Sequence, residues 1–552
     1  MCHIFLFLNV AGDRRSSPMA LRSKLWTNRQ GPKGGATAVA SLASAPATEV
    51  TTSEMTAGRK AAIAAKEAAR AAKEAAIAAQ KAAREEHERA ILPNKPTKSA
   101  IKRDAPLRRP KVVARVRPLA QSGGHSNDGQ PVSKRLASWE HNTIVLEDEA
   151  SLGTGSSTAA VRSQAYNFAQ PVLGPDAQQS EVHAAAAADL VKAVCNDGFN
   201  GLLFAYGQTG TGKTHTIMGP ESSWKSLRHA ESGILPRAVA AILDTMRSRE
   251  SSTSSVLTAS AMEFYMSSCL DLLDDGAACI IGPGHRPLGL VSTPIDSEQA
   301  CVGFMATVRE RRHTRATLMN AASDGHDGSS RSHCAMILTL RQLDRASGAV
   351  LTTELHVIDM AGAERPKSVQ STMLAMWDHE DGGEPTIAGQ GMVINYELSQ
   401  LRTAVVQATE CHQKGLPLIN AKAAGTEFVE YTKGCFDCSA LLSMIVTLSP
   451  ARSCGWETWF SCTYGEDLQK LRCPVQPQRP KDLTKSITAA EAAVQRARDE
   501  LASENALNAK FTKRRTCQLR HDERTLEQLQ RLRALGEAGK SSTNEGAWCV
   551  VS

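Results

Sequence analysis

The feature that most constrains this chain is the stretch GFNGLLFAYGQTGTGKTHTIMG, which runs from Gly198 to Gly219. An apolar run, typical of a buried strand, leads into a turn rich in glycine and threonine. The turn matches the pattern G-x-x-x-x-G-K-[ST] from Gly207 to Thr214. Glycines let backbone N–H groups turn inward around phosphate oxygens, and a helix that begins at Lys213 adds the positive end of its dipole. The strand, loop and helix together predict a nucleotide phosphate site.

The side chains of this loop indicate how the nucleotide is held. Lys213 is expected to reach the β- and γ-phosphates, and the hydroxyl of Thr214 to ligate Mg²⁺. The other loop residues are expected to surround the phosphates: Gly207, Gln208, Thr209, Gly210, Thr211 and Gly212. We therefore expect a nucleoside triphosphate with Mg²⁺ as the cofactors.

Two later segments predict a sensor for the γ-phosphate. GSSRSH, from Gly328 to His333, precedes one long strand-like run, and DMAGAER, from Asp359 to Arg365, ends the next. A carboxylate at a strand end can hold Mg²⁺ through a water molecule, and Gly362 can offer its N–H to the γ-phosphate. The two serines beside an arginine in the first segment can order the metal and an attacking water.

Together with the glycine loop, these segments resemble the kinesin motor family. The matching pieces are ARVRPL, GFNGLLFAYGQTGTGKTHTIMG, EFYMSSCLDLL, SSRSH, DMAGAER and INYEL, and they occur in the family's order across residues 111–472. The resemblance implies an α/β fold of the P-loop NTPase type, with a central mixed sheet flanked by helices. It also implies ATP as the nucleotide, ATP hydrolysis as the activity and microtubules as the partner.

The resemblance also implies a role for each matching residue. Arg115 and Pro118 would flank the adenine, with His215 on its other side. Ser329 and Ser330 would belong to the first switch, where Ser330 ligates Mg²⁺ and both position the attacking water. Asp359, through water on Mg²⁺, and Gly362 would belong to the second switch. Arg331 and Glu364 would form the ion pair that closes the site for hydrolysis.

The departures from the family pattern gather on the track-binding side. In the nucleotide site, His326 stands where the family usually has asparagine, and Ala363 replaces a serine. After Asn395 the usual Lys-Ser is missing, and an acidic insertion, MWDHEDGGEP, precedes it. The family's Pro-Tyr-Arg-x-Ser-Lys-Leu-Thr run reads PLINAKAAG here, at 417–425. Because tubulin is strongly acidic, lost bases predict weak or regulated microtubule binding rather than ordinary processive movement.

Composition divides the rest of the chain into segments. Residues 1–111 hold 21 Lys and Arg against 9 Asp and Glu, a net charge of +12, and the remaining residues sum to −5. The predicted order is a disordered basic extension at 1–56, an Ala/Lys/Glu-rich helix at 57–92, a linker at 93–110, the motor domain at 111–472, a second linker at 473–482, a helical segment at 483–535 and a flexible tail at 536–552.

Two interpretations of the helical segment at 483–535 stay open. Apolar residues at heptad-like spacing, Ile487, Val494 and Leu501 and then Leu519, Leu526, Leu529 and Leu532, fit a short coiled coil that would pair two copies of the chain. They fit equally an amphipathic helix packed on its own domain. The chain ends CVVS, so Cys549 matches a prenylation box and would bring the tail to a membrane.

Cysteine usage and hydropathy predict a soluble protein. The fourteen cysteines have no regular spacing, and the close pair Cys435 and Cys438 lacks a second pair to complete a zinc site. No apolar run approaches the roughly 20 residues of a membrane span. The opening HIFLFL is too short for a signal core, and translation could start at Met1 or Met19. We expect a location in the cytoplasm, on the microtubule cytoskeleton, with membrane association if Cys549 is prenylated.

Three function classes follow from these features. The first is a kinesin-like microtubule ATPase, which the switch segments favour. The second is a non-motile pseudo-motor that serves as a microtubule or membrane adaptor. The third is a P-loop enzyme acting on a small molecule, against which the switch segments argue. Nucleic acid is not among the expected partners.

Overall fold

The computed structural model describes most of the chain beyond its N-terminal extension. The described ranges are 106–118, 134–148, 163–266, 268–319, 331–364, 387–413, 426–436, 439–451, 454–502 and 509–547. The extension predicted at 1–56, the helix predicted at 57–92 and the C-terminal CVVS lie outside them, so those three interpretations stay predictions. In the described ranges, no helix joins the length and the apolar content that a bilayer crossing requires.

A mixed sheet forms the centre of the domain. Its parallel part consists of β1 (Lys111–Val116), β13 (Leu441–Leu448), β5 (Gly201–Tyr206) and β12 (Ala349–Asp359), in that order. The sheet continues antiparallel through β11 (His333–Asp344), β6 (Thr253–Tyr265), β7 (Ser268–Asp271), β8 (Ala278–Ile281) and β9 (Pro287–Leu288). Both long strands predicted from the sequence are present, and β5 is buried along its whole length, as its apolar run predicts.

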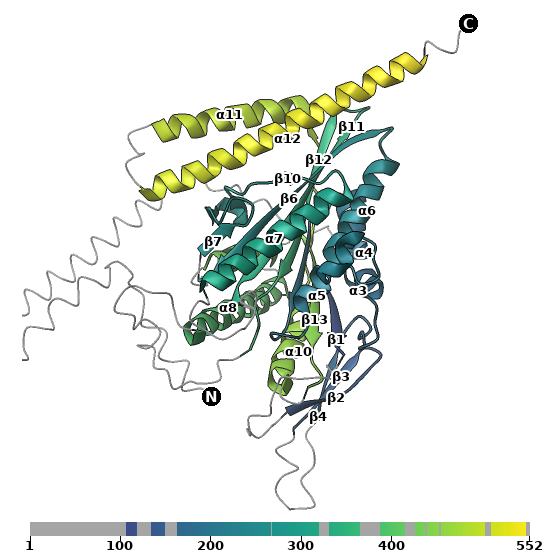
Figure 1. The fold of residues 1–552 in the computed structure, drawn as a ribbon, viewed down its shortest axis with the longest axis vertical. Coiled ribbons are helices and arrows are strands. Elements are labelled where there is room, and N and C mark those ends of the chain that lie inside the picture. Colours follow the sequence, from purple (N-terminus) through teal and green to yellow (C-terminus); the bar gives the residue numbers. More distant parts are fainter. Residues whose placement is uncertain are drawn as a thin grey trace, which may run out of the picture. The chain divides into compact units, whose positions relative to one another are not determined.

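Helices cover both faces of this sheet (Figure 1). One face carries α3 (Gln179–Ala186), α4 (Ala188–Asn196), α6 (Ile234–Ser248) and α7 (Glu298–Met319), and the other carries α8 (Ile387–Gln413), α9 (Glu427–Phe436) and α10 (Gly455–Gln469). Strand residues alternate between the two faces. In β6, Leu257 and Ala259 belong to the hydrophobic cluster under α3, α4, α6 and α7. Met262 and Phe264 belong to the hydrophobic cluster under α8, α9 and α10. The central mixed sheet flanked by helices is thereby confirmed.

A smaller sheet extends the domain beside α10. It consists of β2 (Lys134–Glu140), β3 (Thr143–Asp148) and β4 (Ser163–Asn167), all antiparallel. Lys134 anchors it, because its ammonium lies 2.5 Å from Asp148 and 4.9 Å from the ring centre of Trp456 on α10.

The segment after α10 returns to the central sheet. Cys473 exchanges backbone hydrogen bonds of 2.8 and 2.9 Å with Arg108, and the Gln478 N–H donates to the Gly198 carbonyl at 2.7 Å. β14 (Lys481–Asp482) then pairs with the start of β12, while the short β10 (Thr293–Pro294) pairs with β6. Residues 473–482, predicted as a linker, therefore pair with the domain along their length.

Two helices follow and lie side by side across one end of the sheet (Figure 1). They are α11 (Leu483–Ala502) and α12 (Ala509–Ala547), here called the C-terminal hairpin. Its buried apolar residues Leu483, Ile487, Ala490, Leu529 and Leu532 pack on sheet residues Val256, Leu343 and Val350. Of the two interpretations left open for this segment, the structure has the amphipathic helices packed on their own domain.

Candidate nucleotide site

The glycine loop joins β5 to the short helix α5 (Lys213–Ile217), and its geometry requires glycine. A side chain at Gly207 would place its Cβ 2.3 Å from the carbonyl oxygen of Thr447, which leaves no room for one. Gly210 and Gly212 have φ angles of 79° and 94°, in the left-handed region. The hydroxyl of Thr211 lies 2.7 Å from that of Thr447 on β13 and fixes the loop to the sheet. The loop is thus a rigid turn at the carboxyl end of a buried parallel strand.

Lys213 lies beneath this loop. Its ammonium donates to the carbonyl oxygens of Gly207 at 2.9 Å and Gln208 at 3.0 Å. Burial lowers the pKa of Lys213, while Asp359 and Glu364 nearby favour its charged form. A buried cation whose partners are chiefly neutral carbonyls is suited to exchange them for phosphate oxygens, which compensate its charge better.

The residues expected to hold Mg²⁺ lie together. The Thr214 hydroxyl donates to one oxygen of Asp359, Oδ2, at 2.7 Å, and Arg312 donates to the same oxygen at 2.9 Å. The second oxygen, Oδ1, is buried and has no hydrogen-bond partner. An unpartnered buried carboxylate oxygen beside a hydroxyl matches the oxygen-rich donor set that Mg²⁺ prefers. Thr214 and Asp359 therefore fit the metal, while Ser329 and Ser330 lie outside the described residues.

The second switch segment contacts the glycine loop directly. The Ala363 N–H donates to the Gly207 carbonyl at 3.1 Å, and Glu364 accepts from the backbone and hydroxyl of Thr209 at 2.8 and 2.5 Å. A Cβ on Gly362 would lie 2.1 Å from the Thr209 hydroxyl and 2.2 Å from the Glu364 carboxylate, so any side chain here would have to push these two groups aside. Arg331 and Glu364 are both described; the Glu364 carboxylate is held by Thr209, and no ion pair joins it to Arg331 in this structure. Their pairing stays a prediction for the closed site.

The residues expected beside the adenine meet through a glutamine that the sequence did not single out. Arg115 donates to the Gln179 side chain at 3.1 Å and to the Thr216 hydroxyl at 2.8 Å. The Gln179 amide in turn lies 3.0 Å from Nδ1 of His215. Burial lowers the pKa of His215, and the charge of Arg115 lowers it further. His215 is therefore favoured in its neutral form, which suits stacking on a base; Pro118 is exposed nearby in the chain.

A second set of residues missed by the sequence supports Asp359 from below. Arg312, on α7, donates to Asp359 and to the Ser332 carbonyl, the latter at 3.2 Å. Its guanidinium lies 4.0 Å from Glu263, whose carboxylate accepts from the Ser332 hydroxyl at 2.6 Å. Burial opposes the charge of Arg312, but Cys334 and the two carboxylates more than compensate and raise its pKa. No local pattern marks Arg312, because its partners come from distant strands.

The family to which this arrangement belongs is decided by comparison with known proteins. The sequence description of the kinesin motor domain matches residues 115–471, which is more than half of the chain. This chain belongs to the kinesin family. Its glycine loop and second switch are therefore those of a kinesin motor domain.

Individual kinesins resemble it only distantly. Kinesin-like protein KIF15 of Rattus norvegicus is 27% identical over 406 residues, which cover 71% of this chain and 26% of the rat protein. Kinesin-like protein Klp61F of Drosophila melanogaster is 33% identical over 208 residues, covering 35% and 18%. The match thus spans about a quarter of KIF15. A solved structure of a fast kinesin aligns with a TM-score of 0.50 and 22% identity over 67% of this chain and 94% of that one, a likeness of fold.

In this kinesin, His333 joins the two switches to the helices behind them. Its Nδ1 accepts from the Ala361 N–H at 3.1 Å, and its ring stacks on Phe428 of α9 at 3.8 Å. Its Nε2 lies 3.4 Å from the carboxylate of Glu397 on α8. Asn395 on the same helix donates to the Glu364 carbonyl at 2.8 Å. The second switch is therefore in contact with α8 through Asn395, and with α8 and α9 through His333.

Helix α8 is poor in bases. Arg402 is the one Lys or Arg of α8, and it pairs with Asp467 on α10 at 2.8 Å. The exposed side chains of α8 include Met392 and Tyr396 instead. The stretch at 417–425 and the acidic insertion lie outside the described residues.

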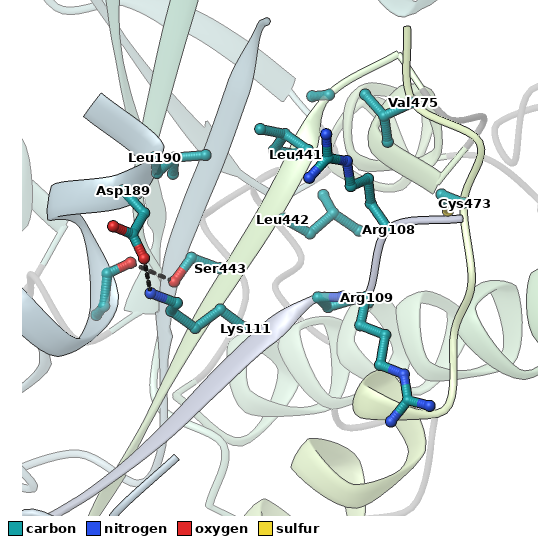
Figure 2. Close-up of a pocket in the computed structure, with 13 residues that line it drawn as sticks. Arg108, Arg109, Lys111, Asp189, Leu190, Leu441, Leu442, Ser443, Cys473 and Val475 are labelled. Atoms are coloured by element: carbon teal, nitrogen blue, oxygen red, sulfur yellow. Dashed lines mark hydrogen bonds and ion pairs between the residues drawn. The ribbon is translucent and has the colours of Figure 1, made fainter. Parts of the chain in front are cut away.

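A separate pocket lies at the opposite ends of the parallel strands. Figure 2 shows Arg108, Lys111, Leu442 and Val475 among the residues that line it. The volume of the pocket is about 230 Å³. It is lined by the first residues of β1 and β13, whereas the glycine loop follows the last residue of β5. This pocket is therefore not part of the nucleotide site; Val475, from the segment after α10, forms one wall of it.

Proposed function

We propose that this kinesin binds Mg-ATP, hydrolyses it and couples the state of the nucleotide to its affinity for microtubules. The observation that supports this most is the direct contact between the second switch and the glycine loop, through Ala363 on Gly207 and Glu364 on Thr209. A γ-phosphate held by this loop would meet the backbone of Gly362. Its presence or loss would then decide where the switch lies.

The chain's own residues supply positioning and charge. Lys213 would turn from the loop carbonyls to the β- and γ-phosphates, and Gly207 to Thr214 would surround them with N–H groups. Thr214 and Asp359 would hold Mg²⁺, which when bound neutralises charge on the phosphates. Ser329 and Ser330 would orient the attacking water, and Arg331 and Glu364 would close the site. His333 and Asn395 would carry the change to α9 and α8.

We propose further that microtubule binding is weak or regulated. Exposed charge sets much of the encounter rate with an acidic partner, and α8 offers only Arg402, already paired with Asp467.

A pairing of two chains through 483–535 would require the C-terminal hairpin to leave its domain, and light scattering tests it. Prenylation of Cys549 would bring the tail to a membrane, and mass spectrometry of the native protein tests that.

The same base-poor surface favours one rival. A non-motile adaptor would bind ATP without stimulation of its turnover by microtubules. A P-loop enzyme acting on a small molecule has no comparable support, because the family match extends through both switches.

The deciding experiment is ATP turnover of the full chain with and without polymerised tubulin, with Lys213→Ala as the control. The full chain is needed because removal of the hairpin would expose Leu343 and Val350. Stimulation by microtubules that Lys213→Ala abolishes is expected. Flat turnover with intact ATP binding would contradict the proposal and favour the adaptor.

A further inference from the structure

The C-terminal hairpin lies on the same face of the central sheet as α8 and α9. On β6, Val256 contacts the hairpin cluster, whereas Met262 and Phe264, both an even number of residues away, belong to the cluster under α8 and α9. On β12, Val350 and Ile358 divide in the same way. Residues an even number apart on a strand point to the same face. The hairpin and the two helices are therefore neighbours on one face.

A lobe of the sheet edge lies between them. It runs from β7 through β8 and the turn η3 (Pro283–His285) to β9. Toward α9, the Ile281 N–H donates to Glu427 at 2.9 Å and His285 lies 2.7 Å from the Glu430 carbonyl. Toward α12, Asp274 pairs with Arg520 at 3.0 Å. The first half of α12 thus borders the same lobe as α9.

This half of α12 is strongly basic. Residues 509–520, AKFTKRRTCQLR, hold five bases and no acid. The amino end of a helix disfavours bases, because its dipole is positive there, so this charge opposes helix stability. Arg515 pairs with Glu500 at 2.5 Å and Arg520 with Asp274, and both fix the helix in place. Two of the five bases thus form ion pairs that hold the helix, and this half of α12 carries positive charge beyond those two.

Lys513 and Arg514 carry the surplus, and we call this pair the basic turn. Both are exposed, and in the described part of the chain neither forms an ion pair. They lie four and three residues before Cys517, which is buried against the lobe at Gly289. This spacing places them on the same helix face as Cys517, one turn beyond the lobe. The inward face of α12 thus continues past the domain as positive charge.

We propose that the basic turn is an auxiliary contact for the acidic surface of the microtubule. It stands on the same face as α8 and α9 and supplies exposed positive charge that α8 lacks. This inference rests on the proposed function, because it assumes that the face carrying α8 and α9 meets the track. The hairpin then extends the track-binding surface across the lobe.

The test is co-sedimentation of the full chain with microtubules at two salt concentrations, in a non-hydrolysable ATP analogue. The double variant Lys513→Glu/Arg514→Glu is compared with Lys485→Glu/Arg533→Glu, which reverses two exposed bases elsewhere on the hairpin. We expect the first variant to bind about 5- to 10-fold more weakly at low salt, with a smaller loss at high salt, since exposed charges are screened. The second should bind within about twofold of the unmodified chain.

The outcomes separate the two proposals. If the unmodified chain binds and both variants bind equally well, the basic turn is not a track contact and the proposed function survives. If the unmodified chain does not bind microtubules at all, the proposed function fails and this inference fails with it. Binding of the unmodified chain to anionic phospholipid vesicles that only the first variant loses, with microtubule affinity unchanged, would assign the basic turn to a membrane and overturn the proposal.

Discussion

Replacing Arg312 by leucine should destabilise the domain strongly. Its side chain is 4% exposed and that of Asp359 2%, so the ion pair of 2.9 Å between them is screened little by water. Arg312 also faces Glu263 at 4.0 Å, and its removal takes a buried positive charge away from two buried carboxylates. Removal of one partner from a buried ion pair costs about 3–5 kcal/mol. We expect Arg312→Leu to lower the free energy of unfolding by an amount in this range.

The assay is urea unfolding, followed by tryptophan fluorescence and by circular dichroism so that coincident curves establish a two-state transition. Arg309→Leu is the matched control on the same helix. Arg309 is 53% exposed and lies 3.3 Å from Glu221, which is 67% exposed, so its loss should cost about 1 kcal/mol or less. A loss for Arg312→Leu no larger than that of the control would refute the argument that Arg312 compensates buried charge beneath the metal site.

Two further predictions concern the second switch and the hairpin. Gly362→Ala should lower ATP turnover at least about tenfold with the fold retained by circular dichroism, because its Cβ would overlap the Thr209 hydroxyl at 2.1 Å; turnover near that of the unmodified chain would show that this approach is not needed. Burial, and then the charge of Arg524, lower the pKa of His521 to about 4. Glu354 opposes this shift, and Arg286 and Arg341 add to it. The unfolded chain therefore binds a proton that the folded chain does not, and stability should fall as the pH drops from about 6.5 to about 4. His521→Gln should make the free energy of unfolding, measured in urea, fall less steeply with decreasing pH. His183, whose pKa is also lowered to about 4, is present in both chains and contributes equally to both. If the dependence of the free energy of unfolding on pH were the same in the variant, the assignment to His521 would be wrong.

The parts of the site that the sequence predicted are those in which the backbone conformation and the backbone N–H groups form the site. Gly207 and Gly212 have positive φ angles, and Gly362 approaches the Thr209 hydroxyl closely. Because each position favours glycine for a local reason, the spacing of these glycines can be recognised in the sequence. The buried strands could be predicted as well, because a strand that is buried on both faces, such as β5, has a continuous apolar sequence. The ordering of these elements into a kinesin fold came from the resemblance rather than from the pattern alone.

The supporting side chains could not be predicted, because their partners come from elsewhere in the fold. Arg312 lies 47 residues from Asp359, and Gln179 lies 64 residues from Arg115. The hairpin was ambiguous for another reason. Apolar residues at heptad spacing bury equally well against a second chain or against a sheet, and only the positions of Val256, Leu343 and Val350 separate the two. Tertiary context, not local propensity, decided both.

The cluster that holds the hairpin has a mechanical consequence. Leu483, where the hairpin begins, and Leu532, in the second half of α12, belong to the same cluster on the sheet. Tension applied to the C-terminus would therefore reach that cluster, and pass from it to β14, before it loads residues 491–528, which lie between the cluster members Ala490 and Leu529. Those residues amount to about 130 Å of chain when fully extended. While the cluster holds, whatever is attached to the tail is tethered closely to the motor domain; if it yields, the tether lengthens by that stored distance.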